Sequence, residues 1–194
     1  MAYKPSENKK IFITMRPLTE EEMEAVLKKL LKFVGDNIRH LINRSDGIYV
    51  FRLHKDRVYY SSETLMKQAT AFSMNEIIAF GTCIGKFTKT KKFHLTITAL
   101  DVIVPYCKCK VWVKANAEQS FLYGNHILKA GVGRITDDVE PNAGIIVYNM
   151  TDMPLGFGIA SKSTSDIRKS DPSAVAVINI ADIGQYVRDE QHII

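Results

Sequence analysis

The sequence predicts an α+β protein of two domains. An N-terminal α/β domain, in which helices cover a sheet, precedes a C-terminal pseudo-barrel of short β-strands with one short helix. Two observations predict this fold class. Apolar residues recur with helical spacing from Met23 to Val34, ahead of several β-rich runs. Beyond residue 107, short strand-like runs follow at near-regular spacing, punctuated by glycine and proline. The 194 residues, 46% of them apolar, suffice for two small globular domains.

The first helix is expected to begin at Thr19. The Thr19 hydroxyl suits the N-cap position, Glu22 completes a capping box, and Glu20 and Glu21 suit the positive end of the helix dipole. Gly35 is expected to interrupt the helix, and the apolar pattern continues over residues 38–42.

The remaining elements of the first half are mostly strands. Runs at 48–53 and 57–60 flank a polar loop and predict a hairpin. A short helix over 62–71 and two further strands over 77–84 and 93–100 complete the N-terminal domain.

The second half predicts short strands around one helix. Strands are expected over 110–114, 131–135, 144–149, 155–160 and 174–180, with the helix over 117–122. The expected boundaries are a flexible leader over 1–14, the N-terminal domain over 15–107, the barrel domain over 108–189 and a tail over 190–194.

Charge is distributed unevenly along the chain. Residues 1–110 hold 19 Lys and Arg against 11 Asp and Glu, a net charge of +8, whereas residues 111–194 hold 7 against 10, a net charge of −3. A basic field confined to one half favours a polyanionic partner. The alternative is a basic surface that serves only solubility.

The segment 86–94 carries the strongest indication of RNA binding. Lysines provide contacts to phosphate, and aromatic side chains can stack on unpaired bases. Its lysines are Lys86, Lys89, Lys91 and Lys92, interleaved with Phe87 and Phe93. The alternative is a solvated hairpin tip whose phenylalanines turn into the core. A second basic group, open to the same two interpretations, is Arg52, His54, Lys55 and Arg57.

Other chemistry finds little support. The run Gly81–Phe87 is similar to a phosphate-binding loop, but it is one residue short, and Phe87 replaces the Ser or Thr that would hold magnesium. Neither a nucleophile elbow nor a zinc-protease helix is present. The odd count of three cysteines favours reduced thiols, and no second cluster joins Cys107 and Cys109 to complete four ligands. We therefore expect no catalytic residues, no metal, no cofactor and no membrane segment.

Several longer motifs resemble one family. They are MRPLTEEE at 15–22, FRLH at 51–54, DRVYY at 56–60, GTC at 81–83, GKFTKT at 85–90, AEQSFLYGNH at 117–126, PLGFG at 154–158 and ADIG at 181–184. Through these motifs the chain resembles the Nip-seven family, which comprises eukaryotic nucleolar factors of large-ribosomal-subunit biogenesis. The resemblance covers nearly everything from Met15 on, and Met15 looks like the start of the family's sequence.

The resemblance implies a C-terminal PUA domain, a β-barrel module that binds RNA. It also implies a role in precursor-rRNA processing and 60S subunit assembly, a nuclear and nucleolar location, and nucleolar assembly factors as partners of a monomeric chain. In PUA domains a short helix, the following glycine-rich turn and a nearby strand form the RNA face. Carried onto this sequence, the candidate RNA-binding residues are Tyr123, Asn125, Lys129, Arg134, Lys162, Arg168 and Lys169.

The negative charge of the PUA half predicts weak RNA affinity for that half alone. We therefore expect a shared surface, in which the PUA face supplies shape and the lysines of 86–92 supply attraction to precursor rRNA, including U-rich segments. One alternative is a protein-interaction scaffold with incidental RNA contact. Another is an RNA-modifying enzyme, which a domain of about 90 residues without a cofactor glycine loop disfavours.

Overall fold

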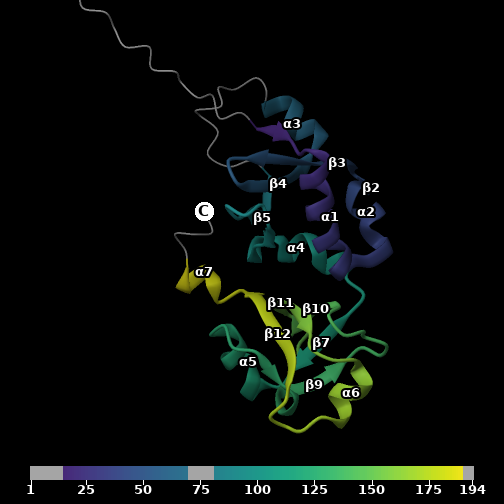
Figure 1. Cartoon of the computed structure of the whole chain (residues 1–194), viewed down its shortest axis with the longest axis vertical. Helices are drawn as coiled ribbons and strands as arrows, with labels where there is room; N and C mark the ends of the chain where they lie inside the picture. The colour runs from purple at the N-terminus through teal and green to yellow at the C-terminus, as the bar shows by residue number, and fades with distance from the viewer. Residues whose placement is uncertain (1–14, 70–80, 190–194) are drawn as a thin grey trace, which may run out of the picture.

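The computed structural model of the chain describes residues 15–69 and 81–189. Within these ranges, two β-sheets with their helices follow one another along the long axis of the molecule (Figure 1). Helix α4 (Leu100–Ile103) lies between the N-terminal sheet and strands of the C-terminal sheet (Figure 1). This mixed architecture confirms the predicted fold class.

Helix α1 (Glu20–Val34) begins as the sequence predicts. The Thr19 hydroxyl accepts a hydrogen bond from the Glu22 amide at 3.3 Å, and the Glu22 carboxylate accepts one from the Thr19 amide at 2.9 Å. The helix ends at Gly35, whose φ of 53° suits a residue without a side chain. The 3₁₀ turn Gly35–Asn37 then leads into α2 (Ile38–Ile42).

The first sheet is antiparallel, with the strand order β1-β3-β4-β5-β6 and β2 paired to β3. Its strands are β1 (Arg16–Pro17), β2 (Asn43–Arg44), β3 (Gly47–His54), β4 (Arg57–Ser62), β5 (Thr82–Phe87) and β6 (Phe93–Leu95). The expected 48–60 hairpin is confirmed. Helix α3 (Glu63–Ala69) follows β4; the expected helical residues 70–71 and strand residues 77–80 lie outside the described residues.

The expected strand over 93–100 is wrong beyond Leu95. A 3₁₀ turn (Ile97–Ala99), α4 and a second 3₁₀ turn (Val104–Tyr106) follow β6 instead. Ile97, Leu100 and Ile103 are all buried, and their spacing of three residues places them on one side of a helix. A continuous apolar run does not by itself distinguish this arrangement from a buried strand.

The second sheet has the order β8-β12-β11-β10-β7-β9 and is antiparallel except for the β7–β10 pair. Its strands are β7 (Lys110–Val113), β8 (Ile127–Leu128), β9 (Val132–Ile135), β10 (Gly144–Tyr148), β11 (Pro154–Ala160) and β12 (Val175–Asp182). A 3₁₀ turn (Lys129–Gly131) precedes β9, and the helices are α5 (Ala115–Leu122), α6 (Thr164–Lys169) and α7 (Gln185–Arg188).

The expectation of a single short helix in this half is wrong. Helix α6 starts at Ser163, whose hydroxyl accepts a hydrogen bond from the Asp166 amide at 3.2 Å. Only Thr164 and Ile167 of α6 are buried, so the segment lacks the apolar stripe that would have predicted a helix.

The two domains share a hydrophobic core. All five residues of β10 are buried. Ile146 and Tyr148 join the core of the N-terminal domain, whereas Ile145 and Val147 join the core of the second sheet. Strand β10 is therefore apolar throughout because both of its faces are covered. The shared core fixes the surfaces of the two domains relative to each other.

No helix among residues 15–69 and 81–189 is long and apolar enough to cross a bilayer.

Candidate nucleic-acid interface

The turn between β5 and β6 is held in a defined conformation. The Thr88 amide donates to the Lys92 carbonyl at 2.9 Å, and the Lys91 amide donates to the Thr88 carbonyl at 2.8 Å. The Thr88 hydroxyl also accepts from the Lys92 amide at 3.2 Å. These bonds occupy the polar groups inside the turn, and the exposed side chains of Lys89, Lys91 and Lys92 extend into solvent.

Lysines from α1 and from this turn meet in one groove, which we call the cationic groove. It has a volume of about 350 Å³, and Ala25 and Phe93 form its apolar part. Its basic residues are Lys28, Lys29 and Lys32 from α1 with Lys91, Lys92 and His94 from the β5–β6 segment. Side chains of like charge gathered on two packed elements attract a polyanion such as an RNA backbone.

The structure divides the four lysines predicted in segment 86–92 between two sides of the sheet edge. Lys91 and Lys92 line the cationic groove, whereas Lys86 lies opposite Arg57 in the β4–β5 pairing. Lys86 lines a second hollow with His54, Lys55 and Arg57. Lys89 lies in a third hollow, whose basic residues Arg16, Lys55 and Lys91 are accompanied by four acidic ones, Glu20, Glu21, Glu22 and Asp56.

His54 adds little charge to the second hollow. Burial, together with the nearby Lys55 ammonium, lowers the pKa of His54, so its imidazole is neutral at physiological pH. Arg52, from the same predicted basic group, lies apart: its Nε contacts Met66 Sδ at 3.0 Å, and its Nη1 donates to the Phe51 carbonyl.

The two phenylalanines of the segment pack with each other. Their ring centroids are 5.2 Å apart, Phe93 is 2% exposed and Phe87 is half-buried. The idea that both stack on bases is therefore wrong, because the Phe93 ring belongs to the core. Along β6 the buried Phe93 and Leu95 flank the exposed His94, as expected for a strand with one buried face.

In the PUA half, three of the predicted residues line one pocket. Lys129, Arg134 and Arg168 come from the turn before β9, from β9 and from α6, around a volume of about 270 Å³. We call this the PUA pocket. Arg168 Nη2 lies 2.6 Å from Asp137 Oδ1, so an incoming phosphate must compete with this carboxylate.

Arg134 is part of a stack that sequence reasoning missed. Its guanidinium lies 3.6 Å from the ring centroid of Trp112, and Trp112 stacks on Tyr148 with centroids 5.7 Å apart. The Trp112 indole N–H donates to Asp152 at 2.6 Å. The stack holds Arg134 in a fixed position, while 63% of its side chain remains exposed. In the sequence, this stack could have been suspected from Trp112, the single tryptophan, which stands in a strand with alternating apolar and polar residues.

The other predicted PUA residues lie in two places. Lys162 donates to the Ser170 hydroxyl at 3.3 Å across α6, and Lys169 is exposed at the end of that helix. Tyr123 and Asn125 are exposed after α5, where the Asn179 side chain donates to the Asn125 carbonyl at 3.4 Å. Neither Tyr123 nor Asn125 lines the PUA pocket.

A partly buried ion pair supports the corner at Asn125. The Asp182 carboxylate, 1% exposed, accepts hydrogen bonds from Arg188 at 3.1 Å and from Asn179 at 3.1 Å. Arg188 also donates to the Leu122 carbonyl. These contacts tie α5, β12 and α7 together.

Sequence reasoning also missed Lys28, Lys29 and Lys32. Their position opposite the buried face of α1 was available from the helical period, but their proximity to the β5–β6 turn depends on how β6 packs against α1.

Among the described residues, no group of three or more His, Cys, Asp or Glu could hold a metal ion. Burial raises the pKa of Cys107 to about 11, so it is a neutral thiol.

Comparisons with known proteins cover both halves of the chain. Residues 15–97 match the model of the NIP7/UPF0113 pre-PUA domain, and residues 109–191 match that of the UPF0113 PUA domain. The 60S ribosome subunit biogenesis protein NIP7 homolog of Xenopus laevis is 57% identical over 176 residues, covering 91% of this chain and 98% of that protein. The Mus musculus homolog is 57% identical over 177 residues, with the same coverage.

A solved structure supports the fold independently. A PUA domain from Aeropyrum pernix K1 superimposes with a TM-score of 0.57 at 16% identity, covering 90% of this chain and 88% of that one. At that identity the likeness concerns the fold alone. The matches to both family models, and the identity to relatives over nearly their full length, confirm the resemblance seen in the motifs: the chain belongs to the NIP7/UPF0113 family.

Proposed function

We propose that the chain is a non-catalytic RNA-binding assembly factor of the large ribosomal subunit, acting in precursor-rRNA processing in the nucleus and nucleolus. Relatives at 57% identity are named 60S ribosome subunit biogenesis proteins. The observation that carries the RNA-binding part is the cationic groove, where α1 and the β5–β6 segment bring five lysines and a histidine around one hollow.

RNA contact is divided between the two domains in this proposal. The cationic groove, together with Lys86 and Lys89, attracts the phosphate backbone, and the electrostatic part of the binding energy comes from there. The PUA pocket positions the RNA through Lys129, Arg134 and Arg168. In this proposal Lys162, Lys169, Tyr123 and Asn125, which lie outside that pocket, add further RNA contacts. We propose the domain boundaries expected from the sequence: a leader over residues 1–14, the N-terminal domain over 15–107, the PUA domain over 108–189 and a tail over 190–194.

The side chains of both surfaces serve binding rather than bond-breaking. Ammonium and guanidinium groups donate hydrogen bonds to phosphate oxygens. Incubating the purified chain with S-adenosylmethionine and unmodified rRNA tests for methyl transfer, and we expect none.

We further propose that the chain binds as a monomer and prefers single-stranded, U-rich RNA. Pyrimidine runs stack weakly, so their backbone adapts readily to a charged groove. Competition between U-rich and A-rich RNA of equal length tests the preference.

The test of the proposed function is crosslinking of the chain to RNA in cells, with the crosslinks mapped on precursor rRNA and on this sequence. We expect RNA adducts on peptides that contain residues 86–92 and 129–134, at positions in large-subunit precursor rRNA. Adducts confined to other proteins, with none to RNA, would favour the alternative, a scaffold that only docks assembly factors.

A further inference from the structure

Two aromatic side chains and one cationic side chain stack across neighbouring strands of the second sheet. Trp112 of β7 lies opposite Arg134 of β9 in one strand pair and opposite Tyr148 of β10 in the other. Tyr148 is 7% exposed and belongs to the core of the N-terminal domain, and Trp112 packs against that core. We call Tyr148, Trp112 and Arg134 the edge stack, because β9 is the last strand at this edge of the sheet that the described residues form.

A β-bulge turns Arg134 towards solvent. Val132 and Ile135 pack into the core of the second sheet, whereas the two residues between them, Gly133 and Arg134, are exposed. In a regular strand these two residues would face opposite sides, but the register of the β7–β9 pair shifts here. Met150 lies beside the bulge, since a Cβ at Gly133 would be 2.9 Å from the Met150 sulfur.

The turn between β10 and β11 holds the edge stack in place. Asp152 Oδ1 accepts a hydrogen bond from the Trp112 indole N–H at 2.6 Å and lies 3.9 Å from Arg134 Nη2. The Asn149 side chain stabilises the turn by accepting a hydrogen bond from the Met153 amide at 2.9 Å. An arginine held in this way has less conformational entropy to lose when it binds a ligand.

The Arg134 guanidinium has one covered face and one open face. Its central carbon lies 3.6 Å from the Trp112 ring centroid, which is van der Waals contact with the ring. Since 63% of the side chain is still exposed, and β9 is the edge strand of the described sheet, the opposite face is turned to solvent. Unpaired RNA bases stack on guanidinium planes as they do on aromatic rings. A base on Arg134 extends the edge stack by one layer.

The charges around Arg134 favour a base over a phosphate as the group in contact. Asp152 stands beside one N–H edge of the guanidinium, so a phosphate that approaches this edge meets a carboxylate of like charge. An uncharged base on the open face meets no such repulsion. Lys129 and Arg168 line the PUA pocket together with Arg134 and can contact the phosphates of the adjoining nucleotides.

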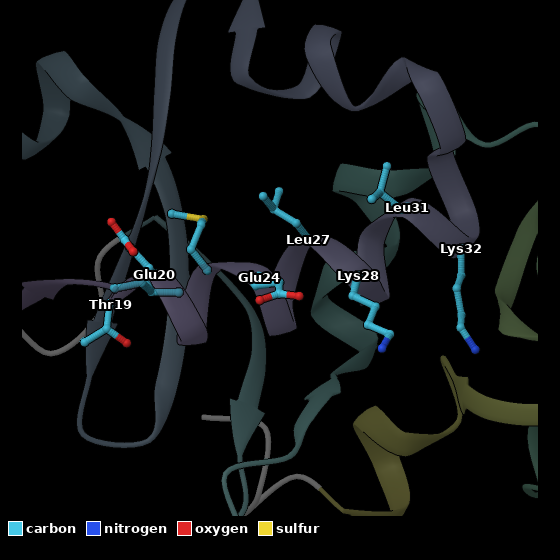
Figure 2. Close-up of a pocket in the computed structure, with 9 residues that line it drawn as sticks. Thr19, Glu20, Glu24, Leu27, Lys28, Leu31 and Lys32 are labelled. Carbon is cyan, nitrogen blue, oxygen red and sulfur yellow. The ribbon is translucent and has the colours of Figure 1, made fainter.

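The cationic groove has a different character. Figure 2 shows Lys28 and Lys32 extending from the same side of α1, and both line that groove. An ammonium group attracts phosphate as a point charge and has no plane on which a base can stack. The groove therefore suits attraction of the RNA backbone, whereas the edge stack suits contact with a single base.

We propose that the edge stack is a stacking site for one unpaired base of RNA, with Arg134 as the residue that contacts the base. This inference rests on the proposed function and deepens it, because the PUA half then binds a base as well as phosphates. Met150, which is 59% exposed, offers its thioether to the edge of the bound base. Bases inside a duplex are stacked on each other, so the site takes a nucleotide from a single strand or a loop.

The experiment uses the full chain and two RNAs of about ten nucleotides, a length within the usual range for a single-strand binding domain. One is a uridine oligonucleotide, and the other is its fully abasic counterpart, which keeps the ribose and phosphate groups. The variant Arg134→Lys keeps the charge but removes the guanidinium plane. Arg39→Lys is its matched control, because Arg39 of α2 is exposed and lies outside the cationic groove and the PUA pocket. Thermal unfolding verifies that both variants fold.

We expect Arg134→Lys to weaken binding of the uridine RNA about fivefold and to change binding of the abasic RNA less than about twofold. Arg39→Lys should change neither by more than about twofold. Equal weakening on both RNAs overturns the proposal, because Arg134 then contacts phosphate. Unchanged binding of both RNAs also overturns it and assigns the open face to a protein partner. If the native chain binds neither RNA at low salt, the proposed function itself fails, and this inference fails with it.

Trp112 gives a second readout, because it is the single tryptophan of the chain. The heavy atom of bromouridine quenches an indole only at short range. At saturation, a bromouridine RNA should therefore quench Trp112 emission more strongly than the uridine RNA does, and Arg134→Lys should reduce this difference. Equal quenching of the native chain by the two RNAs contradicts the placement of a base on the edge stack.

Discussion

Phe33 of α1 packs edge-on against Phe157 of β11, with ring centroids 5.3 Å apart and an interplanar angle of 79°. The two rings belong to different domains, and Phe33 is 3% exposed while Phe157 is fully buried. Gly144 makes this contact possible, because a Cβ at that position would lie 2.5 Å from the Phe33 ring. The relative placement of the two candidate RNA surfaces depends on this junction.

Replacing Phe33 with Ala should therefore destabilise the whole chain. We expect a loss of about 3–5 kcal/mol in the free energy of unfolding, because the ring leaves a cavity between the domains. In the native chain, far-ultraviolet circular dichroism and the fluorescence of Trp112, the single tryptophan, should report the same unfolding transition. In the variant, the two signals should change at different denaturant concentrations. Leu65→Ala, at an exposed position, serves as the control. A loss below about 1 kcal/mol for Phe33→Ala would show that the junction contributes little.

Lys91 allows charge to be separated from backbone conformation. Its φ is 58°, a left-handed value that glycine adopts without strain. Lys91→Gly should keep or slightly raise stability, yet lower RNA affinity about two- to fivefold by removing one phosphate contact. Asn142→Gly is the matched control, since Asn142 has a φ of 64° and carries no charge. If both variants bind RNA equally well in a filter-binding titration, Lys91 contributes no phosphate contact.

The pair between Arg168 and Asp137 predicts a gain of affinity. Asp137→Asn releases the Arg168 guanidinium from a contact of 2.6 Å, so RNA binding should strengthen at least about threefold. Asp138→Asn is the control, because Asp138 is the exposed neighbour of Asp137 and its replacement changes the net charge by the same amount. Isothermal titration with the same RNA compares the two. Identical gains would mean that net charge alone matters and that Arg168 has no specific role.

Glu22 predicts a defined loss of stability in acid. The Arg16 guanidinium hydrogen-bonds the Glu22 carboxylate and, with the Thr19 amide, lowers the pKa of Glu22 from 4.5 to about 2. Because the folded pKa is the lower one, this stabilisation is present above pH 4.5 and disappears as the pH falls towards 2.

The size of the effect is about 1 kcal/mol, since the pair is partly exposed and screened by solvent. Urea unfolding of wild type and Glu22→Gln, measured from neutral to acidic pH, should show a constant difference that shrinks below pH 4.5. Glu21→Gln, at the exposed neighbouring position, controls for the loss of one charge. A difference that does not change with pH would contradict the role of the Arg16 pair.

Most of the elements predicted correctly from the sequence depend on patterns among neighbouring residues. The capping box of Thr19 and Glu22 and the alternation of β3 and β4 depend on neighbouring residues, so both were predictable. The run from Ile97 to Ile103 was not, because an apolar stretch fits a buried strand and a buried helical turn equally well. Helix α6 was missed because its capping residue, Ser163, precedes a polar segment with few buried side chains.

The candidate site was only half predictable for the same reason. The lysines of 86–92 form a visible cluster in the sequence, but the contribution of Lys28, Lys29 and Lys32 arises from tertiary packing. The division of Lys86 from Lys91 across the sheet edge likewise follows from strand geometry rather than from composition.

The most direct test of the account is the salt dependence of RNA binding by the full chain. A U-rich single strand is titrated between about 50 and 200 mM salt, where the logarithmic slope measures the number of neutralised phosphates. The five lysines of the cationic groove should contribute about −3.5 to this slope, and the variant Lys91→Glu with Lys92→Glu should reduce the magnitude of the slope by at least about 1.4. The variant Arg39→Glu with Lys67→Glu, equal in charge and outside the groove, should leave the slope unchanged. An absence of binding at the lowest salt concentration, or an unaltered slope in the Lys91 and Lys92 variant, would contradict the account.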